Sequence, residues 1–169
     1  MPETFAVIVM GVSGCGKSTV ASMLAARLAF DFAEADTFHS AANVARMQGG
    51  TPLTDEDRWP WLDAIADWVD SSRRAGKPCV VACSALRRSY RERLARGHKD
   101  VCFVYLQGDF NTVAARLAGR TGHYMPPSLL ASQFETLEEP GNDEPAIALS
   151  IEQPADALVD EIVRRLNLS

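Results

Sequence analysis

The chain has 169 residues, of which 47% are hydrophobic and 23% are charged, and its formal net charge is −5 at pH 7. This length and composition suit one compact domain with a full core, and the acidic balance gives no support for nucleic acid or an anionic membrane as a partner. The apolar run near the N-terminus is too short for export or membrane spanning, and the four cysteines lack metal-binding spacing. A reducing cytoplasm is therefore the expected location.

A strand predicted over 5–10 leads into a glycine-rich turn and a helix predicted over 18–28. The turn reads GVSGCGKS and matches G-x-x-x-x-G-K-[ST], in which backbone N–H groups surround the phosphates of a nucleoside triphosphate. Lys17 is expected to bridge the β- and γ-phosphates as a catalytic residue, and Ser18 to ligate Mg²⁺ directly. The alternative is a purely structural turn between strand and helix, which the flanking pattern disfavours. The predicted ATP-binding residues here are Gly11, Val12, Ser13, Gly14, Cys15, Gly16, Lys17, Ser18 and Thr19.

The rest of the chain alternates apolar runs with amphipathic patterns. Strands are predicted over 30–32, 79–83, 101–106 and 147–151, and helices over 61–74, 86–96, 110–117 and 155–166. This alternation indicates an α/β fold with a five-stranded parallel sheet flanked by helices, in a single domain spanning 1–169. Two polar segments, about 37–75 and about 118–140, interrupt it. Ligands of such sheets bind beyond the carboxyl ends of the strands, so we expect a substrate-binding segment and a lid with its following helix.

Two carboxylates follow the second predicted strand. We expect Glu34 to hold Mg²⁺ through water, and Asp36 to be a catalytic residue that accepts a proton or hydrogen bond from an acceptor hydroxyl. An acidic loop that caps the next helix accounts for the same spacing equally well. His39 alone is more typical of a cap or a surface position. The strand predicted over 79–83 is followed by Ser84 rather than by a metal-binding aspartate, which disfavours a motor protein or GTPase and suits a small-molecule kinase.

Arginines are the main cations of the chain. Arg116 and Arg120 border a glycine-containing segment and are expected to bind ATP, with Arg120 neutralising transition-state charge; a solvated helix end is the alternative. At least one arginine after Ser84 is expected to reach the carboxyl edge of the sheet. Arg58 lies beside Trp59 and Trp61, an aromatic pair that is more typical of a core than of a binding site.

Beyond the phosphate loop, the chain resembles the gluconate kinase family. The run from Asp36 to Leu62, DTFHSAANVARMQGGTPLTDEDRWPWL, is similar to the family signature G-D-x-x-H-x-x-x-N-x-x-K-M-x-x-G-x-P-L-x-D-x-D-R-x-P-W-L. The stretch CSALRRSYR at 83–91 resembles C-S-A-L-[KR]-x-x-Y-R, and GHY at 122–124 and SQFETLEEP at 132–140 resemble the lid and post-lid segments. The departures are small: Ala35 replaces a usual glycine, and Arg46 replaces a common lysine.

The resemblance implies a P-loop kinase fold of the nucleoside-monophosphate-kinase type, usually a homodimer, that phosphorylates D-gluconate at its 6-hydroxyl with Mg-ATP. It raises the expectation that His39 and Arg58 are functional, and it makes Arg120 the lid arginine on ATP. Which arginine holds the gluconate carboxylate stays open among Arg58, Arg88 and Arg91. The substrate-binding residues it implies are Asp36, His39, Arg58, Arg88, Arg91, His123 and Gln133.

Two alternatives accompany this interpretation. A related kinase, such as one acting on shikimate, would share the phosphate loop but not the block at 43–62. A nucleotide-binding regulator without turnover would be expected to have lost one of Lys17, Asp36 and Arg120, and all three are present.

Overall fold

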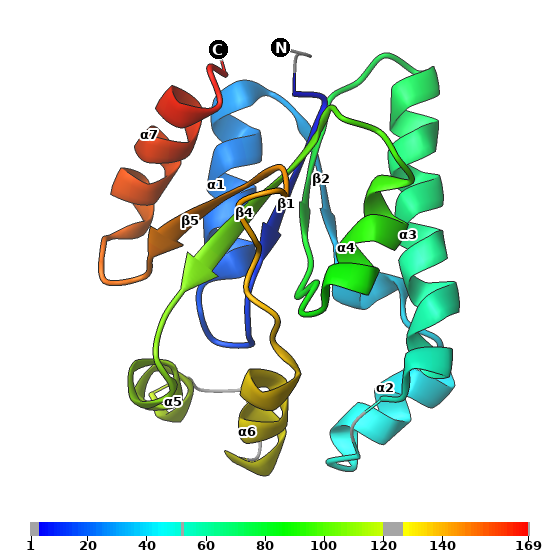
Figure 1. The fold of residues 1–169 in the computed structure, drawn as a ribbon, viewed down its shortest axis with the longest axis vertical. Helices are drawn as coiled ribbons and strands as arrows, with labels where there is room; N and C mark the ends of the chain where they lie inside the picture. Colours follow the sequence, from blue (N-terminus) through cyan, green and yellow to red (C-terminus); the bar gives the residue numbers. More distant parts are fainter. Residues whose placement is uncertain (1–3, 52, 120–126, 169) are drawn as a thin grey trace.

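A computed structural model describes residues 4–51, 53–119 and 127–168 (Figure 1). A short 3-10 helix, Ala35–Phe38, follows the second strand. The strands are β1 Ala6–Met10, β2 Asp31–Glu34, β3 Cys79–Ala82, β4 Val101–Gln107 and β5 Ala146–Ser150. The helices are α1 Lys17–Leu28, α2 Ala41–Gln48, α3 Asp55–Arg74, α4 Arg88–Ala95, α5 Phe110–Ala118, α6 Pro127–Thr136 and α7 Ala155–Arg165.

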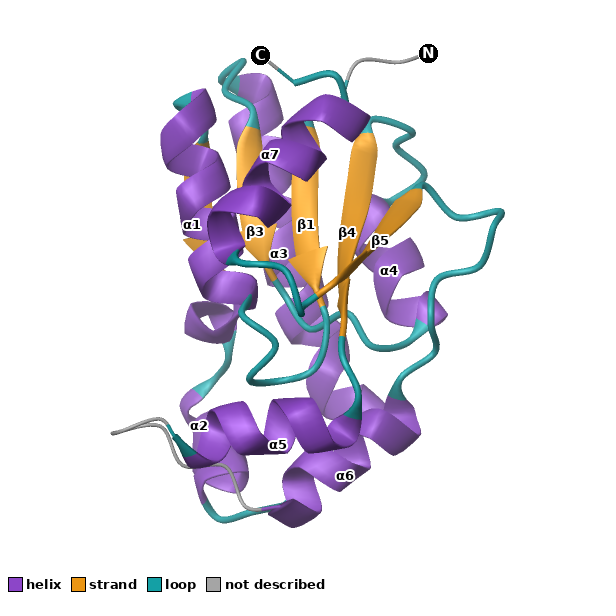
Figure 2. Cartoon of the chain, turned by 90° about the vertical axis from the view of Figure 1, so that its left-hand side faces the viewer, coloured by secondary structure: helices purple, strands orange, loops and turns teal. Residues whose placement is uncertain are grey.

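The five strands form one parallel sheet in the order β2-β3-β1-β4-β5. All carboxyl ends therefore lie at one edge, and Figure 2 shows α2, α5 and α6 gathered beyond that edge. The strand order changes direction at β1: β3 and β2 lie on one side of β1, and β4 and β5 lie on the other. Such a switch point, followed by the phosphate loop, is where ligands bind in open α/β sheets. The predicted five-stranded parallel sheet is confirmed.

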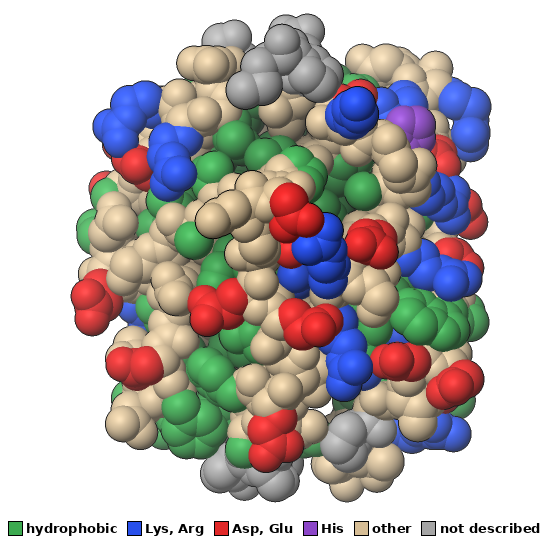
Figure 3. Space-filling model, viewed as in Figure 1, with side chains coloured by type: hydrophobic (Ala, Val, Ile, Leu, Met, Phe, Trp, Pro, Cys, Tyr) green, Lys and Arg blue, Asp and Glu red, His purple; other side chains and the backbone are tan. Residues whose placement is uncertain are grey.

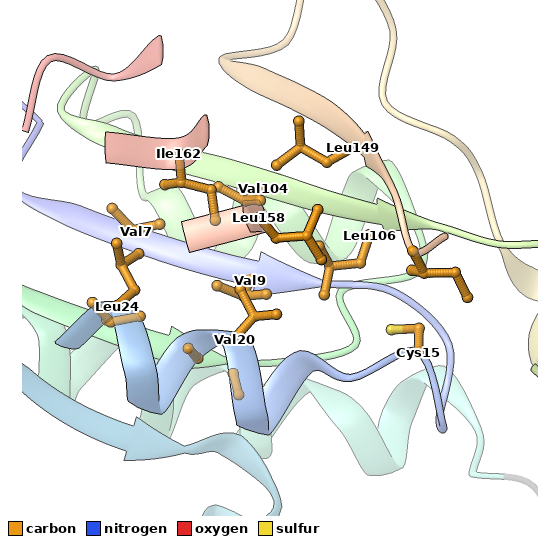
Figure 4. Close-up of a cluster of buried hydrophobic side chains, with 14 of the residues drawn as sticks. Val7, Val9, Cys15, Val20, Leu24, Val104, Leu106, Leu149, Leu158 and Ile162 are labelled. Atoms are coloured by element: carbon orange, nitrogen blue, oxygen red, sulfur yellow. The ribbon is translucent and has the colours of Figure 1, made fainter. Parts of the chain in front are cut away.

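Both faces of the sheet are buried, because successive side chains of each strand point to opposite sides. Val7 and Val9 of β1 pack with Val20, Leu24 and Leu158 of α1 and α7, as Figure 4 shows. On the other face, side chains of β1 and β3 pack against α3 and α4; this cluster includes Ile8, Met10, Ile65, Val81, Tyr90 and Phe103. This two-sided burial explains why the strands read as continuous apolar runs rather than as alternating patterns.

The predicted elements differ from the observed ones mainly in the polar segments. Helix α3 begins at Asp55, six residues before its predicted start, because Thr54 and Asp57 form a capping box that exchanges side-chain and backbone hydrogen bonds. Helix α2 was not predicted; it begins after Ser40, whose side chain accepts the N–H of Asn43 at 3.2 Å. Capping has therefore fixed helix starts where hydrophobic periodicity is weak.

The surface mixes both signs of charge. On the face in Figure 3, acidic and basic side chains lie interspersed over α3, α4 and the segment before β5. Several form ion pairs between helices, such as Arg93 with Asp63 at 2.8 Å and Arg96 with Asp70 at 2.7 Å. Within the described ranges, no helix combines the length and apolar character needed to cross a membrane.

Candidate active site

The phosphate loop connects β1 to α1 through three glycines with positive φ: Gly11 at 144°, Gly14 at 86° and Gly16 at 97°. These angles strain any residue with a Cβ. Space is also limited, since a Cβ on Gly11 would lie 2.8 Å from Cys15 Sγ and one on Gly14 would lie 2.6 Å from Leu117 Cγ. Cys15 is only 2% exposed and joins the core beneath the loop (Figure 4). The loop is thus built into the core on its inner side.

Three polar groups predicted to act at the phosphates converge here. Lys17 Nζ donates to the carbonyl of Val12 at 3.1 Å, and the Ser18 hydroxyl donates to Glu34 Oε1 at 2.6 Å. Burial raises the pKa of the Cys83 thiol to about 12, and the charges of Lys17, Asp36 and Glu34 also act on that thiol. The ends of β1, β2 and β3 therefore bring these residues to one place.

The pair Ser18–Glu34 meets the chemical requirements of a magnesium site. Mg²⁺ prefers hard oxygen ligands and keeps several waters, so one hydroxyl and one carboxylate beside the phosphates suit it. Among the described residues, no group of three or more His, Cys, Asp and Glu could hold a metal ion by protein ligands alone. A metal here would accordingly share its shell with water and phosphate oxygens.

The segment after β2 places His39 beside Asp36. The His39 ring stacks on Trp61, with centroids 4.2 Å apart and planes 13° apart, and its Nδ1 lies 3.4 Å from Asn43 Nδ2. Because an amide nitrogen only donates, Nδ1 is the acceptor and the neutral ring carries its proton on Nε2. Burial lowers the pKa of His39; the charge of Asp36 opposes this and that of Arg58 adds to it. His39 is thus held as a neutral donor between an acid and a cation.

Trp61 contacts both His39 and the backbone just before Asp36. Its indole N–H donates to the carbonyl of Ala35 at 2.7 Å, in a buried hydrogen bond that fixes the backbone just before Asp36. Its ring also stacks on the His39 ring. The expectation that Trp61 is a core residue is confirmed, since it is 5% exposed, but its polar contact was not foreseen. A single tryptophan therefore sets the positions of both Asp36 and His39.

Arg58 is held by Tyr90 of α4. Its Nη1 donates to the Tyr90 hydroxyl at 2.9 Å, its guanidinium lies 5.3 Å from the Tyr90 ring centroid, and the same hydroxyl donates to Asp55 Oδ1 at 2.5 Å. Burial and the hydrogen bond to Asp55 raise the pKa of Tyr90. The chain Arg58–Tyr90–Asp55 orients the guanidinium on the same segment as His39.

Arg91 and Arg88 are engaged elsewhere. Arg91 is 2% exposed; it donates to Glu144 at 2.6 and 3.1 Å, to the carbonyl of Ala85 at 2.8 Å and to that of Glu138 at 2.9 Å. Arg88 donates to Asp143 at 2.6 and 3.1 Å. Both side chains therefore fasten the segment before β5 to α4.

Gln133 and Arg116 lie at the phosphate loop and beside it. Gln133 Oε1 accepts the N–H of Ser13 at 2.7 Å, so its amide faces the loop. Arg116 donates to the carbonyl of Ile151 at 2.5 Å and lines a pocket of about 440 Å³. The remaining lining includes Gly14, Gly16, Thr19, Ala115, Gln153, Pro154 and Leu158. Arg120 and His123 lie outside the described residues.

A second pocket, of about 460 Å³, lies between the ends of β4 and β5 and the helices α5 and α6. Its lining includes Asp109, Glu139 and Glu152. Burial and the neighbouring Glu139 raise the pKa of Tyr105 on its wall. Negative charge of this kind repels phosphates, so the pocket at Arg116 is the better match for a nucleotide.

Residue type and spacing indicated Lys17, Asp36 and His39 as candidate site residues but not the contacts that position them. Neither Asn43, which sets the His39 tautomer, nor Tyr90, which holds Arg58, was assigned a role from the sequence. The usable signals were the spacing of Asn43 four residues after His39, which places both on one side of a helical turn, and the pairing of Arg58 with an aromatic cluster.

Comparisons with known proteins identify the family of the chain. A protein-family model described as an AAA domain matches residues 7–140. The gluconokinase of Gluconobacter oxydans is 49% identical over 158 residues, covering 94% of this chain and 89% of that protein. A sugar kinase of Janibacter sp. superposes with a TM-score of 0.93 at 46% identity, covering 99% of this chain and 96% of its own.

A gluconokinase structure from Sinorhizobium meliloti gives a TM-score of 0.88 at 42% identity, covering 98% of this chain and 94% of its own. A shikimate kinase from Aquifex aeolicus is 17% identical with a TM-score of 0.62, so it shares the fold alone. On the extent and identity of these matches, the chain belongs to the gluconokinase family of P-loop kinases.

Proposed function

We propose that this protein transfers the γ-phosphoryl group of ATP to the 6-hydroxyl of D-gluconate, giving 6-phospho-D-gluconate and ADP. The observation that carries the proposal is the placement of Asp36, His39 and Arg58 at the sheet edge that also holds the phosphate loop. An acceptor carrying hydroxyls and a carboxylate needs an acid, a neutral donor and a cation at that place. Membership in the gluconokinase family supports the same substrate.

The nucleotide is expected to bind through the loop and the pocket beside it. The backbone N–H groups of the loop and Lys17 surround the phosphates, with the partial positive charge of the α1 N-terminus behind them. The base and ribose fit the pocket of about 440 Å³ lined by Arg116, Pro154 and the loop glycines. Ser18 would ligate Mg²⁺ and Glu34 would hold one of its waters. When bound, the metal would stabilise the negative charge on the transferring phosphoryl group.

The acceptor side follows from hydrogen-bonding capacity. In the transfer, a bond forms between the 6-oxygen and the γ-phosphorus while the bond to the β,γ-bridging oxygen breaks. Asp36 accepts the proton of the 6-hydroxyl or orients it by a hydrogen bond. His39 donates through Nε2–H to a sugar-acid oxygen, and Arg58 binds the carboxylate through its planar guanidinium. We assign the carboxylate to Arg58 because its acidic neighbour Asp55 lies 4.0 Å away, whereas Arg88 and Arg91 each donate to a carboxylate at 2.6 Å.

Several finer assignments rest on the resemblance and are part of the proposal. They comprise Arg120 as the arginine on the transferring phosphoryl group, His123 as a substrate residue, a homodimeric assembly and a cytoplasmic location. The four free cysteines are consistent with a reducing compartment.

An ADP-release assay with D-gluconate, shikimate, D-glucose and nucleoside monophosphates as acceptors tests the proposal, with Lys17→Ala as the inactive control. Turnover is expected with gluconate. The enzyme should prefer gluconate to glucose, because glucose lacks the carboxylate. Turnover with shikimate but not with gluconate would refute the substrate. ATP binding without acceptor-dependent ADP release would instead indicate a nucleotide-binding regulator.

A further inference from the structure

Gln133 of α6 holds Ser13 of the phosphate loop by two hydrogen bonds. Its Oε1 accepts the Ser13 N–H at 2.7 Å, and its Nε2 donates to Ser13 Oγ at 3.2 Å. Both polar atoms of the amide are therefore committed to one loop residue 120 positions away in the sequence. The contact is partly buried, so an unpaired Ser13 N–H there would cost free energy.

A second contact restrains the neighbouring residue of the loop. Leu117 of α5 packs so closely on Gly14 that a Cβ at that position would lie 2.6 Å from Leu117 Cγ. Helices α5 and α6 also pack on each other, with the rings of Phe110 and Phe134 meeting edge to face at 5.6 Å. Helices α5 and α6 therefore both contact the phosphate loop, at Gly14 and Ser13 respectively.

The loop needs such external contacts. Gly11, Gly14 and Gly16 have wide backbone freedom, so the local sequence alone does not select the curled conformation. A phosphate site works best when its N–H groups already point at the ligand, because ordering them on binding reduces affinity. Cys15 restrains the loop from the core side, and α5 and α6 contact it through Leu117 and Gln133.

We propose that Gln133 is a positioning residue for the nucleotide: it preorganises the phosphate loop by holding Ser13, and it does not bind the sugar acid. The Ser13 N–H is satisfied by Gln133 and the Cys15 N–H by the carbonyl of Val12, which leaves other N–H groups of the loop, such as those of Gly14 and Gly16, to point at the phosphates. This deepens the proposed function, on which it rests for the identity of the second substrate, and it replaces the expectation that Gln133 binds gluconate.

The variant Gln133→Met tests the proposal, because it keeps the length and apolar packing of the side chain but removes the amide. ATP affinity, measured by calorimetric titration without any sugar acid, is expected to fall roughly tenfold, in line with the loss of a buried hydrogen-bond partner. The KM for ATP should rise similarly, while the KM for gluconate stays within about twofold. Glu135→Ala, on an exposed position of the same helix, is the matched control and should change neither.

A double-mutant cycle with Ser13→Ala separates this role from general destabilisation. Ser13→Ala removes the hydroxyl that accepts from Gln133 but keeps the Ser13 N–H, so it should weaken ATP binding less than Gln133→Met does and have little further effect in the Gln133→Met background. Additive effects, or a raised KM for gluconate with unchanged ATP affinity, would overturn the proposal. The titration uses ATP alone, so it stands even if gluconate proves to be the wrong acceptor.

Discussion

The buried ion pair between Arg91 and Glu144 gives the sharpest test of how the motif residues are used. The Arg91 side chain is 2% exposed and that of Glu144 is 8% exposed, and their closest approach is 2.6 Å. Glu144 also accepts the N–H of Gly141 at 2.8 Å. Glu144→Gln keeps the shape of this contact but leaves the buried guanidinium without a counter-charge.

The expected cost is large. Removing one partner of a buried pair typically costs about 3–5 kcal/mol, because the remaining charge is desolvated without compensation. Against a whole-domain stability of about 5–15 kcal/mol, this is a substantial fraction. The double variant Arg91→Met, Glu144→Gln carries no buried charge, so it should be more stable than Glu144→Gln. It still loses the donors to the carbonyls of Ala85 and Glu138, so it should not reach the natural stability.

Denaturant unfolding of each variant measures these free energies. Glu92→Gln is the control, since Glu92 pairs with Arg88 at an exposed position, and it should change stability by less than about 1 kcal/mol. If Glu144→Gln left stability unchanged while Arg91→Lys raised the KM for gluconate, Arg91 would be a substrate residue and our assignment would be wrong.

The same pair predicts a pH dependence. Burial alone would raise the pKa of Glu144, but hydrogen bonds from Arg91 and the Gly141 N–H outweigh it, so the pKa lies below its ordinary value of 4.5. The folded protein therefore binds this proton more weakly than the unfolded chain does. The stabilisation is fully present above pH 4.5 and is lost as the pH falls through the folded pKa. The stability difference between the natural chain and Glu144→Gln should narrow over that range.

Three further predictions concern the reaction. Lys17→Ala should lower kcat by a factor that corresponds to several kcal/mol of transition-state stabilisation, about 3–4 kcal/mol, in the ADP-release assay; a loss under tenfold would remove Lys17 from the catalytic residues. Asp36→Asn should preserve ATP affinity in a titration yet lower kcat strongly, and near-normal turnover would contradict its role. Trp61→Phe retains a ring for His39 but loses the hydrogen bond to Ala35, so unfolding should show a loss of about 1–3 kcal/mol, together with a lower kcat; natural values of both would contradict its supporting role.

The fold could be predicted because its signals are local and strong. Buried parallel strands need continuous apolar residues, and a glycine-rich turn of this spacing, placed between a strand and a helix, is typical of a phosphate-binding loop. The strand bounds agree with the prediction to within two residues at each end, and the weakest prediction, 30–32, corresponds to β2 at Asp31–Glu34. β2 is an edge strand whose first two residues are exposed, so its composition is less apolar.

Helix α2 shows why the segment after β2 was harder to predict than the sheet. Only Asn43 of its eight residues is buried, so there is no apolar face for periodicity to detect. Its start depends on the Ser40 cap, and its position depends on the donation from Asn43 Nδ2 to the carbonyl of Asp57 at 2.9 Å, fourteen residues later. A contact of that range has no counterpart in the local sequence pattern.

The arginines show why a residue's role cannot be assigned from a family motif alone. Arg58 and Arg91 both match family positions, and the residue type alone suits either one to a carboxylate ligand. The structure separates them by their acceptors: Arg58 bonds to the Tyr90 hydroxyl and lies 4.0 Å from the Asp55 carboxylate, whereas Arg91 bonds to a buried carboxylate at 2.6 Å and to two backbone carbonyls. A guanidinium with a buried acidic partner would have to break that pair to bind a substrate carboxylate, at the cost of an uncompensated Glu144. A motif position can therefore be required because it holds the site together, and only the acceptor geometry distinguishes that requirement from contact with the substrate.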